Sequence, residues 1–307
     1  MAKAVGIDIG GTNIKAGIVD SSGEVLESVT EPTGAGDVRE TVARLAKDLS
    51  KGPGITGVGI GVAGLLERRD DRVLLCANIP ALDGFSFRDL GIKKKLVVEN
   101  DANAAAFAEL WQGLGSKFKS FVLMTLGTGI GAGIVHDGKL LRVSAEAGHM
   151  SIDASGQKCP CGNYGCLELY AAAGAIVAQA VKALESGAQS MLKECCRGNI
   201  YRVTPDDVYR AALEGDIISR EALKSAGYHL GIGITNLITL LSPEVVVLAG
   251  GLTGAWDIYV AEAIREAGRR SFKGLYDKVE IARSALAPET IGVIGAAGLV
   301  LHSEKTC

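Results

Sequence analysis

The strongest constraint on the fold is a short sequence that occurs twice. Residues 11–19 read Gly-Thr-Asn-Ile-Lys-Ala-Gly-Ile-Val, and residues 127–135 read Gly-Thr-Gly-Ile-Gly-Ala-Gly-Ile-Val, so seven of nine positions are identical at an offset of 116. Each copy follows an apolar run, Ala4 to Ile9 or Phe121 to Leu126, and precedes a polar turn that contains glycine. The pattern predicts strand, glycine turn, strand and turn in each copy. Its repetition predicts an α/β protein with two halves of similar topology that face each other across a cleft.

The two glycine turns are candidate phosphate sites. A Walker A loop or a dinucleotide fingerprint would lead into a helix, whereas Ile14 to Val19 alternates as a strand does. Backbone N–H groups in a hairpin turn can still hold an anion, although hairpins also use glycine for purely conformational reasons. Asp8 is placed to meet Mg²⁺, which binds nucleotides through few carboxylates and several waters. The residues that we expect to contact the nucleotide here are Gly10, Gly11, Thr12, Asn13, Gly127, Thr128, Gly129 and Gly131.

A third glycine turn follows the apolar run Val245 to Leu248. In parallel sheets, ligands collect at the carboxyl ends of the strands. Gly250 and Gly251 could therefore let an adenosine approach the backbone. A plain strand-to-helix turn would need the same residues.

Four metal-binding side chains are close together in the sequence. Cys159, Cys161 and Cys166 lie within eight residues, and His149 lies ten residues before the first of them. A disulfide is disfavoured because Cys159 and Cys161 are only one residue apart. A Cys₃His set suits tetrahedral Zn²⁺, and with all four positions filled by protein the zinc is expected to be structural. Free structural cysteines are the alternative.

A carboxylate suited to proton transfer follows the segment Leu96 to Glu99, which is expected to be a strand. Asn100 and Asp101 come next, and an alanine-rich helix is expected from Ala104 to Trp111. Asp101 could cap that helix, but Asn100 could do so equally well. Phosphoryl transfer needs a carboxylate that accepts the proton of the attacking hydroxyl. Asp101 is the candidate.

Composition limits the partners and the compartment. The 307 residues, 48% of them hydrophobic, suggest about two domains. A net charge of −3 gives no sign of nucleic-acid binding. No apolar run reaches the length of a membrane span, so no membrane partner is expected. Scattered cysteines without a signal peptide predict a cytoplasmic protein.

Taken in order, these motifs resemble the ROK family (repressor, open reading frame, kinase), and within it the glucokinase-type sugar kinases. The resemblance rests on six segments: Asp8 to Asn13, Glu99 to Asn103, Leu126 to Gly131, Glu146 to His149, Cys159 to Glu168 and Ala249 to Gly251. It implies an actin-like, ribonuclease-H-like ATPase fold with two domains around a central cleft. The smaller domain would comprise residues 1–119 and 290–307, and the larger one residues 120–289.

The resemblance also implies roles for individual residues. Asp101 would be the general base that deprotonates the 6-hydroxyl of a hexose for attack on the γ-phosphate of ATP. The cofactors would be ATP, Mg²⁺ and structural Zn²⁺, and a homodimer or homotetramer is expected. The residues implied in sugar binding are Gly64, Asn100, Asp101, Glu146, His149 and Glu168.

One segment departs from the family pattern. Related sequences carry a glycine-rich run before the Glu-x-Gly-His element, whereas this chain has Leu141-Arg142-Val-Ser-Ala145. The identity of the sugar is therefore open: glucose is the first expectation, and N-acetylglucosamine, N-acetylmannosamine and fructose are alternatives. A sugar-responsive repressor of the same family would carry a DNA-binding domain before the first glycine turn, and only seven residues precede Asp8.

Overall fold

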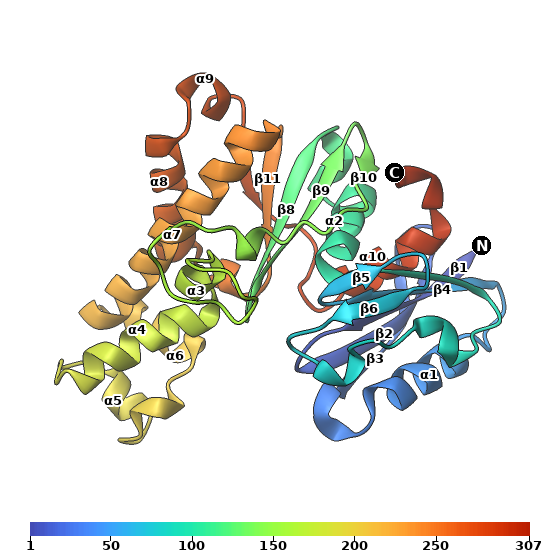
Figure 1. Cartoon of the computed structure of the whole chain (residues 1–307), viewed down its shortest axis with the longest axis horizontal. Coiled ribbons are helices and arrows are strands. Elements are labelled where there is room, and N and C mark those ends of the chain that lie inside the picture. Colours follow the sequence, from blue (N-terminus) through green and yellow to red (C-terminus); the bar gives the residue numbers. More distant parts are fainter. The chain divides into compact units, whose positions relative to one another are not determined.

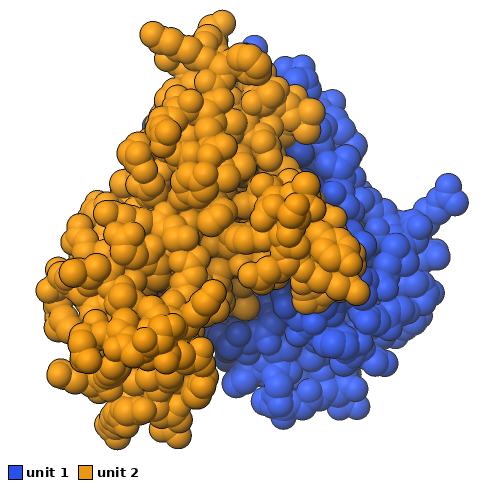
Figure 2. All heavy atoms as spheres, turned by 60° about the vertical axis from the view of Figure 1, so that its left-hand side comes forward, with its two compact units in different colours: residues 1–123, 132–145, 284–307 blue, residues 124–131, 146–283 orange.

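The computed structural model describes all 307 residues and has an α/β fold (Figure 1). By their internal contacts the residues form two compact units, which Figure 2 colours blue and orange. Unit 1 contains residues 1–123, 132–145 and 284–307, and unit 2 contains residues 124–131 and 146–283. The domain bounds expected from the sequence, at residues 119 and 290, stay a prediction, because compact units need not coincide with domains.

The first sheet contains the first copy of the repeated sequence. Its strands lie in the order β3-β2-β1-β4-β7, where β1, β2 and β3 are antiparallel neighbours and β1, β4 and β7 are parallel. The predicted hairpin is present, because Ile9 pairs with Ile14 across the glycine turn. The bounds of the strands are β1 Lys3–Ile9, β2 Asn13–Asp20, β3 Val25–Pro32, β4 Ile55–Val62 and β7 Lys95–Asn100.

The second sheet repeats this topology. Its order is β10-β9-β8-β11-β12. Numbered by their appearance in the chain, the five strands of each sheet therefore follow the same order, 3-2-1-4-5, which confirms the two similar halves predicted from the sequence. The bounds are β8 Phe121–Leu126, β9 Ile130–His136, β10 Lys139–Leu140, β11 Val245–Ala249 and β12 Glu280–Arg283. A small hairpin, β5 Leu65–Glu67 and β6 Arg72–Leu75, belongs to unit 1.

Helices cover both faces of the first sheet (Figure 1). Ile7 and Ile9 of β1 share a core with α1 (Val38–Leu49), while Ala4 packs with α10 (Ile291–Leu301) on the other face. This arrangement follows from the alternation of side chains along a strand.

The contact of α10 with its neighbours is unusually close. A Cβ atom added to Gly6 would lie 2.0 Å from the carbonyl oxygen of Val293, and one added to Gly295 would lie 1.8 Å from that of Ala104 in α2 (Asp101–Gln112). Only glycine permits such an approach. The helix that carries Asp101 is therefore fixed to α10.

The helices of unit 2 surround the 25-residue helix α7, which contacts α3, α4, α6 and α8. The buried hydroxyl of Tyr259 donates to the carbonyl of Ala171 at 2.8 Å and ties two segments of this unit together. No helix of the chain combines the length and the apolar character that a membrane crossing requires. The bounds are α3 Glu168–Ala171, α4 Ala173–Glu185, α5 Leu192–Cys195, α6 Pro205–Leu213, α7 Ile217–Leu241, α8 Ala261–Arg270 and α9 Lys273–Tyr276.

Candidate active site

Three candidate segments of unit 1 follow the carboxyl ends of neighbouring parallel strands. Asp8 in β1 pairs in register with Gly61 in β4, which pairs in turn with Glu99 in β7. Neighbouring strands are about 4.8 Å apart, which places Asp8 and Glu99 about 10 Å from each other along one sheet edge. Each candidate segment comes within three residues after a member of this row: the glycine turn after Asp8, Gly64 after Gly61, and Asp101 after Glu99. The sheet therefore brings the expected phosphate turn and the expected base to the same edge.

The first glycine turn is braced by a residue that the sequence did not indicate. The N–H of Gly10 donates to the carbonyl of Asn13 at 3.0 Å, which closes the turn. The buried Thr33 donates its hydroxyl to the carbonyl of Gly10 at 2.6 Å and its N–H to that of Thr12 at 2.9 Å. Gly11 and Thr12 remain exposed. Thr33 fixes the turn while leaving its outer face accessible to a ligand.

Asp8 lies against the beginning of α10. A Cβ atom added to Gly292 would be 2.4 Å from the Oδ2 atom of Asp8, so glycine is needed there. Burial raises the pKa of Asp8, and the positive charge of Lys15 opposes that shift. A carboxylate that is short of solvent suits a bound cation that replaces the lost solvation. The residue therefore fits Mg²⁺, which needs only one or two carboxylates in a nucleotide site.

The junction between β7 and α2 settles which residue caps the helix. Asn100 is the cap, since its Oδ1 atom accepts from the N–H groups of Ala102 at 2.9 Å and Asn103 at 3.1 Å. Its Nδ2 atom contacts the carbonyl of Gly64 at 3.4 Å. Asp101 is the first residue of the helix and is half-buried. Its Oδ1 atom also accepts from the N–H of Ala102 at 2.9 Å, but Asn100 already caps the helix without it.

The surroundings of Asp101 include a thiol. Burial raises the pKa of Cys76, and the negative charge of Asp101 adds to that shift. The carbonyl of Leu75, next to Cys76, would lie 2.2 Å from a Cβ atom on Gly64, whose φ of +107° also requires glycine. The loop after β6 thus lies beside Gly64 and within electrostatic reach of Asp101.

In unit 2, the second glycine turn binds a carboxylate from another segment. The N–H of Gly127 donates to the carbonyl of Gly129 at 3.0 Å, and that of Gly131 to the hydroxyl of Thr125 at 3.2 Å. The Oε2 atom of Glu168 accepts from the N–H of Ile130 at 2.9 Å and would be 2.4 Å from a Cβ atom on Gly129. Glu168, expected at the sugar, is therefore also anchored to this turn.

The third turn lies beside the second. Gly250 has a φ of +96°, and a Cβ atom on it would be 2.4 Å from the carbonyl oxygen of Leu126, which directly precedes Gly127. Thr253 donates its hydroxyl to the carbonyl of Gly250 at 2.8 Å. Nothing lies within 4 Å of the corresponding position on Gly251. The structure thus leaves space over Gly251 and joins the two turns.

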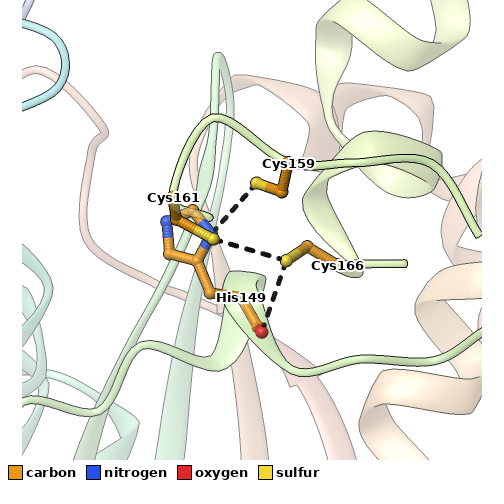
Figure 3. Close-up of side chains that lie close together, drawn as sticks. All are labelled: His149, Cys159, Cys161 and Cys166. Carbon is orange, nitrogen blue, oxygen red and sulfur yellow. Dashed lines mark hydrogen bonds between the residues drawn. The ribbon is translucent and has the colours of Figure 1, made fainter. Parts of the chain in front are cut away.

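The four predicted metal ligands come together in unit 2 (Figure 3). Their ligand atoms all lie within 4.8 Å of one another. The Sγ atoms of Cys161 and Cys166 are 3.6 Å apart, as are the Sγ atom of Cys159 and the Nδ1 atom of His149. A tetrahedron with Zn–S bonds of about 2.3 Å has edges of about 3.8 Å. The geometry and the donor set both fit Zn²⁺.

The backbone around these ligands explains their convergence. Gly162 and Gly165 have φ values of +96° and +64°, and a Cβ atom on Gly165 would be 1.8 Å from the carbonyl oxygen of Asp153. Glu146 precedes the short 3₁₀ turn Ala147–His149 and accepts from the N–H of His149 at 3.0 Å through its carbonyl. The Nδ1 atom faces the thiols, so Nε2 remains for another partner.

Comparison with known protein families gives a match to the ROK family model over residues 4–303. The chain belongs to the ROK family. The family model thus spans nearly the whole chain. The likeness to solved ROK kinases also assigns the actin-like ATPase fold.

Individual ROK relatives match over almost the full length of this chain. A glucokinase from Halalkalibacterium halodurans is 31% identical, with 98% of this chain and 96% of the relative covered. A xylose repressor from Caldicellulosiruptor bescii is 30% identical, with 97% of this chain and 77% of the repressor covered. The crystal structure of a ROK glucokinase from Streptomyces griseus in complex with glucose and AMPPNP has a TM-score of 0.86 and is 29% identical, with 97% and 99% covered.

The structure divides the expected site residues of this ROK protein between two sets. Unit 1 holds the first glycine turn, Asp8, Gly64, Asn100 and Asp101. Unit 2 holds the second and third glycine turns and the metal ligands, together with Glu146 and Glu168. The cleft expected between the two domains stays a prediction.

Proposed function

We propose that this ROK-family chain is an ATP-dependent hexokinase that transfers the γ-phosphate to the 6-hydroxyl of glucose. The relatives named glucokinase support this assignment, as does the solved glucokinase with glucose and AMPPNP. The observation that carries the proposal is the row Asp8, Gly61 and Glu99 across three parallel strands. It puts Asp101 on the same sheet edge as the turn that would receive the phosphates.

Asp101 acts as the general base. Its Oδ1 atom accepts from the N–H of Ala102 at 2.9 Å, and this bond orients the carboxylate at the start of α2. The carboxylate takes the proton of the sugar hydroxyl as that oxygen attacks the γ-phosphate. Asn100 binds the sugar through Nδ2, because its Oδ1 atom is used by the helix cap.

The glycine turns receive the nucleotide. Their N–H groups and the hydroxyls of Thr12 and Thr128 donate to phosphate oxygens, and the open space over Gly251 admits the adenosine. Asp8 would hold Mg²⁺, which when bound neutralises charge on the transferred phosphoryl group. The protein contributes position and charge rather than covalent chemistry.

The segment from Glu146 to Glu168 forms the second wall for the sugar. The three cysteines and the Nδ1 atom of His149 would hold Zn²⁺, which when bound keeps the imidazole in one orientation. His149 then offers its Nε2 atom to a sugar hydroxyl, and Glu146 and Glu168 accept from neighbouring hydroxyls. We further propose domains of residues 1–119 with 290–307 and of residues 120–289, and assembly as a homodimer or homotetramer.

The test measures ADP release with glucose, N-acetylglucosamine, N-acetylmannosamine, fructose and xylose as acceptors. We expect glucose to give the highest kcat/KM. Asp101→Asn should lower kcat by roughly 100- to 10,000-fold, because it removes a general base, while sugar binding measured by calorimetry is retained. A higher kcat/KM with another hexose would identify that hexose, instead of glucose, as the acceptor.

Two further outcomes would contradict the proposal. Near-normal turnover of Asp101→Asn would remove the assignment of the base. Sugar binding without any turnover of the wild-type protein would instead favour a sugar-responsive regulator, as the match to the xylose repressor allows.

A further inference from the structure

We propose that Arg68 and Arg142, acting through the buried carboxylate of Glu99, are positioning residues that hold Asn100 and Asp101 in their reactive placement. This inference rests on the proposed function, because Asp101 is the base of that reaction. The residues Arg68, Glu99, Asn103 and Arg142 are called the Glu99 network below.

Glu99 is a buried acid that accepts hydrogen bonds from four donors. Its side chain is 0% exposed. Its Oε1 atom accepts from the Nη2 atom of Arg68 at 2.8 Å, the Nδ2 atom of Asn103 at 3.1 Å and the N–H of Asn100 at 3.0 Å. Its Oε2 atom accepts from the Nε atom of Arg142 at 2.7 Å. Burial alone would raise the pKa of Glu99, but these hydrogen bonds hold it below its ordinary value.

The donors reach Glu99 from three different segments. Arg68 follows β5, Arg142 follows β10, and Asn103 belongs to α2. The segment after β10 makes two more bonds to the same junction: Arg142 donates from Nη2 to the carbonyl of Val98 at 3.4 Å, and Asn103 donates to the carbonyl of Val143 at 3.0 Å. The end of β7 is therefore fixed from three directions.

The Glu99 network bonds to the residues on both sides of Asp101. On one side it binds the N–H of Asn100, and on the other it includes Asn103, whose own N–H is capped by Asn100. Asp101 lies between these fixed points at the first position of α2. Because a misplacement of about 1 Å in a reacting group can cost roughly 100-fold in rate, this bracing bears directly on turnover.

The network also gives a role to the segment that departs from the family pattern. Within this segment the side chain of Arg142 and the carbonyl of Val143 both bond to the base-bearing junction. The departure is therefore tied to the placement of the base, beyond any effect on the shape of the sugar pocket.

The test compares the wild type with Arg142→Met and Arg142→Lys. We expect Arg142→Met to lower kcat at least tenfold and to raise the KM for sugar by a smaller factor, through Asn100, while the KM for ATP stays within about twofold. Removing a partner of a buried charge displaces the junction between β7 and α2 without touching the nucleotide. Arg142→Lys keeps the charge and should recover part of kcat. Glu99→Gln combined with Arg142→Met should be no worse than the more severe single variant, because both act through one network.

The matched control is Arg44→Met, which breaks the exposed Arg44–Glu31 ion pair of the same unit and should leave kcat unchanged. Thermal melting and circular dichroism report the folded fraction, to which every kcat is normalised. An Arg142→Met variant with lowered stability but wild-type kcat per folded molecule would overturn this inference alone. A wild-type protein without kinase activity would overturn the proposed function and this inference with it.

Discussion

The two glycine turns have the same sequence frame and different chemistry. At the offset of the repeat, Asp8 corresponds to Met124, and Lys15 corresponds to Gly131. The first turn is therefore flanked by a carboxylate, Asp8, and a lysine, Lys15. The second turn has neither, and it binds the carboxylate of Glu168 from a distant segment. The two sheets share one strand order, so single residues within a common frame decide what each half can do.

Among the tests that compare the two turns, the largest effect is expected from removing the acid that distinguishes the first turn. Asp8→Asn should lower kcat/KM for ATP by roughly 100- to 1,000-fold, because it deletes the charge proposed to hold Mg²⁺. Burial raises the pKa of Asp8, so its ionised form costs stability at neutral pH, and the melting temperature of the variant should be equal or higher. Met124→Leu at the corresponding buried position is the control and should leave turnover within twofold. Equal losses in both variants would contradict the asymmetry of the turns.

Removing the metal tests the second half by itself. After chelation we expect the sugar KM to rise roughly tenfold or more, because His149 loses its fixed orientation, while the ATP KM changes little. Metal content by mass spectrometry should be one zinc per chain before chelation. Cys161→Ser should reproduce the effect, and Cys195→Ser, another exposed cysteine, should not. An unchanged sugar KM in the metal-free protein would place the metal away from the sugar.

A smaller effect tests the link between Glu168 and the second turn. In Gly129→Ala the new Cβ atom would lie 2.4 Å from Glu168 Oε2 and would break its bond to Ile130. The loss of one hydrogen bond to a charged group predicts a rise in sugar KM of roughly tenfold. Gly127→Ala is the matched variant, with nothing within 4 Å of its added atom, and its sugar KM should stay within twofold. Identical sugar KM values for the two variants would contradict the proposed role of Glu168 in sugar binding.

The smallest expected effect is a difference in how stability depends on pH between variants of Glu99 and Asp8, the two acids of the row in the first sheet. The pKa of Glu99 is lowered in the folded state, so its contribution to stability is complete above its unfolded pKa and is lost as the pH falls through the folded value. The stability gap between wild type and Glu99→Gln, measured by urea unfolding, should therefore narrow by about 1 kcal/mol or more from pH 6 to pH 3. For Asp8→Asn, where the folded pKa is raised, the advantage of the variant should instead disappear on acidification. If neither difference in the free energy of unfolding changed with pH, the lowered pKa of Glu99 and the raised pKa of Asp8 would both be contradicted.

The sequence predicted those parts of the molecule whose signals are local. The repeated hairpins, the strand from Val245, the helix after Asp101 and the cluster of four candidate metal ligands all depend on residues close together in the chain, and the structure contains each of them. The role of Asn100 as the cap was one of two alternatives, and only the geometry of the hydrogen bonds decided it.

The remaining features depend on contacts between distant segments. Thr33 braces the first turn from the far end of β3, Arg142 reaches Glu99 across 43 positions, and Glu168 reaches Ile130 across 38. No local pattern marks a threonine or an arginine for such a contact, because the partner is set by the strand order. The sequence could flag Arg142 only as a departure from the family pattern.

The packing of α10 has a consequence for the synthesis of the protein on the ribosome. Residues 291–301 cover the face of the first sheet that carries Ala4 and Val19, yet they are synthesised long after those two residues. Until they emerge, Ala4 and Val19 lack these packing partners, and the close contact between Gly6 and the backbone of Val293 cannot form. The nascent chain therefore depends on α10 to protect the apolar face of β1 and β2 from aggregation during synthesis.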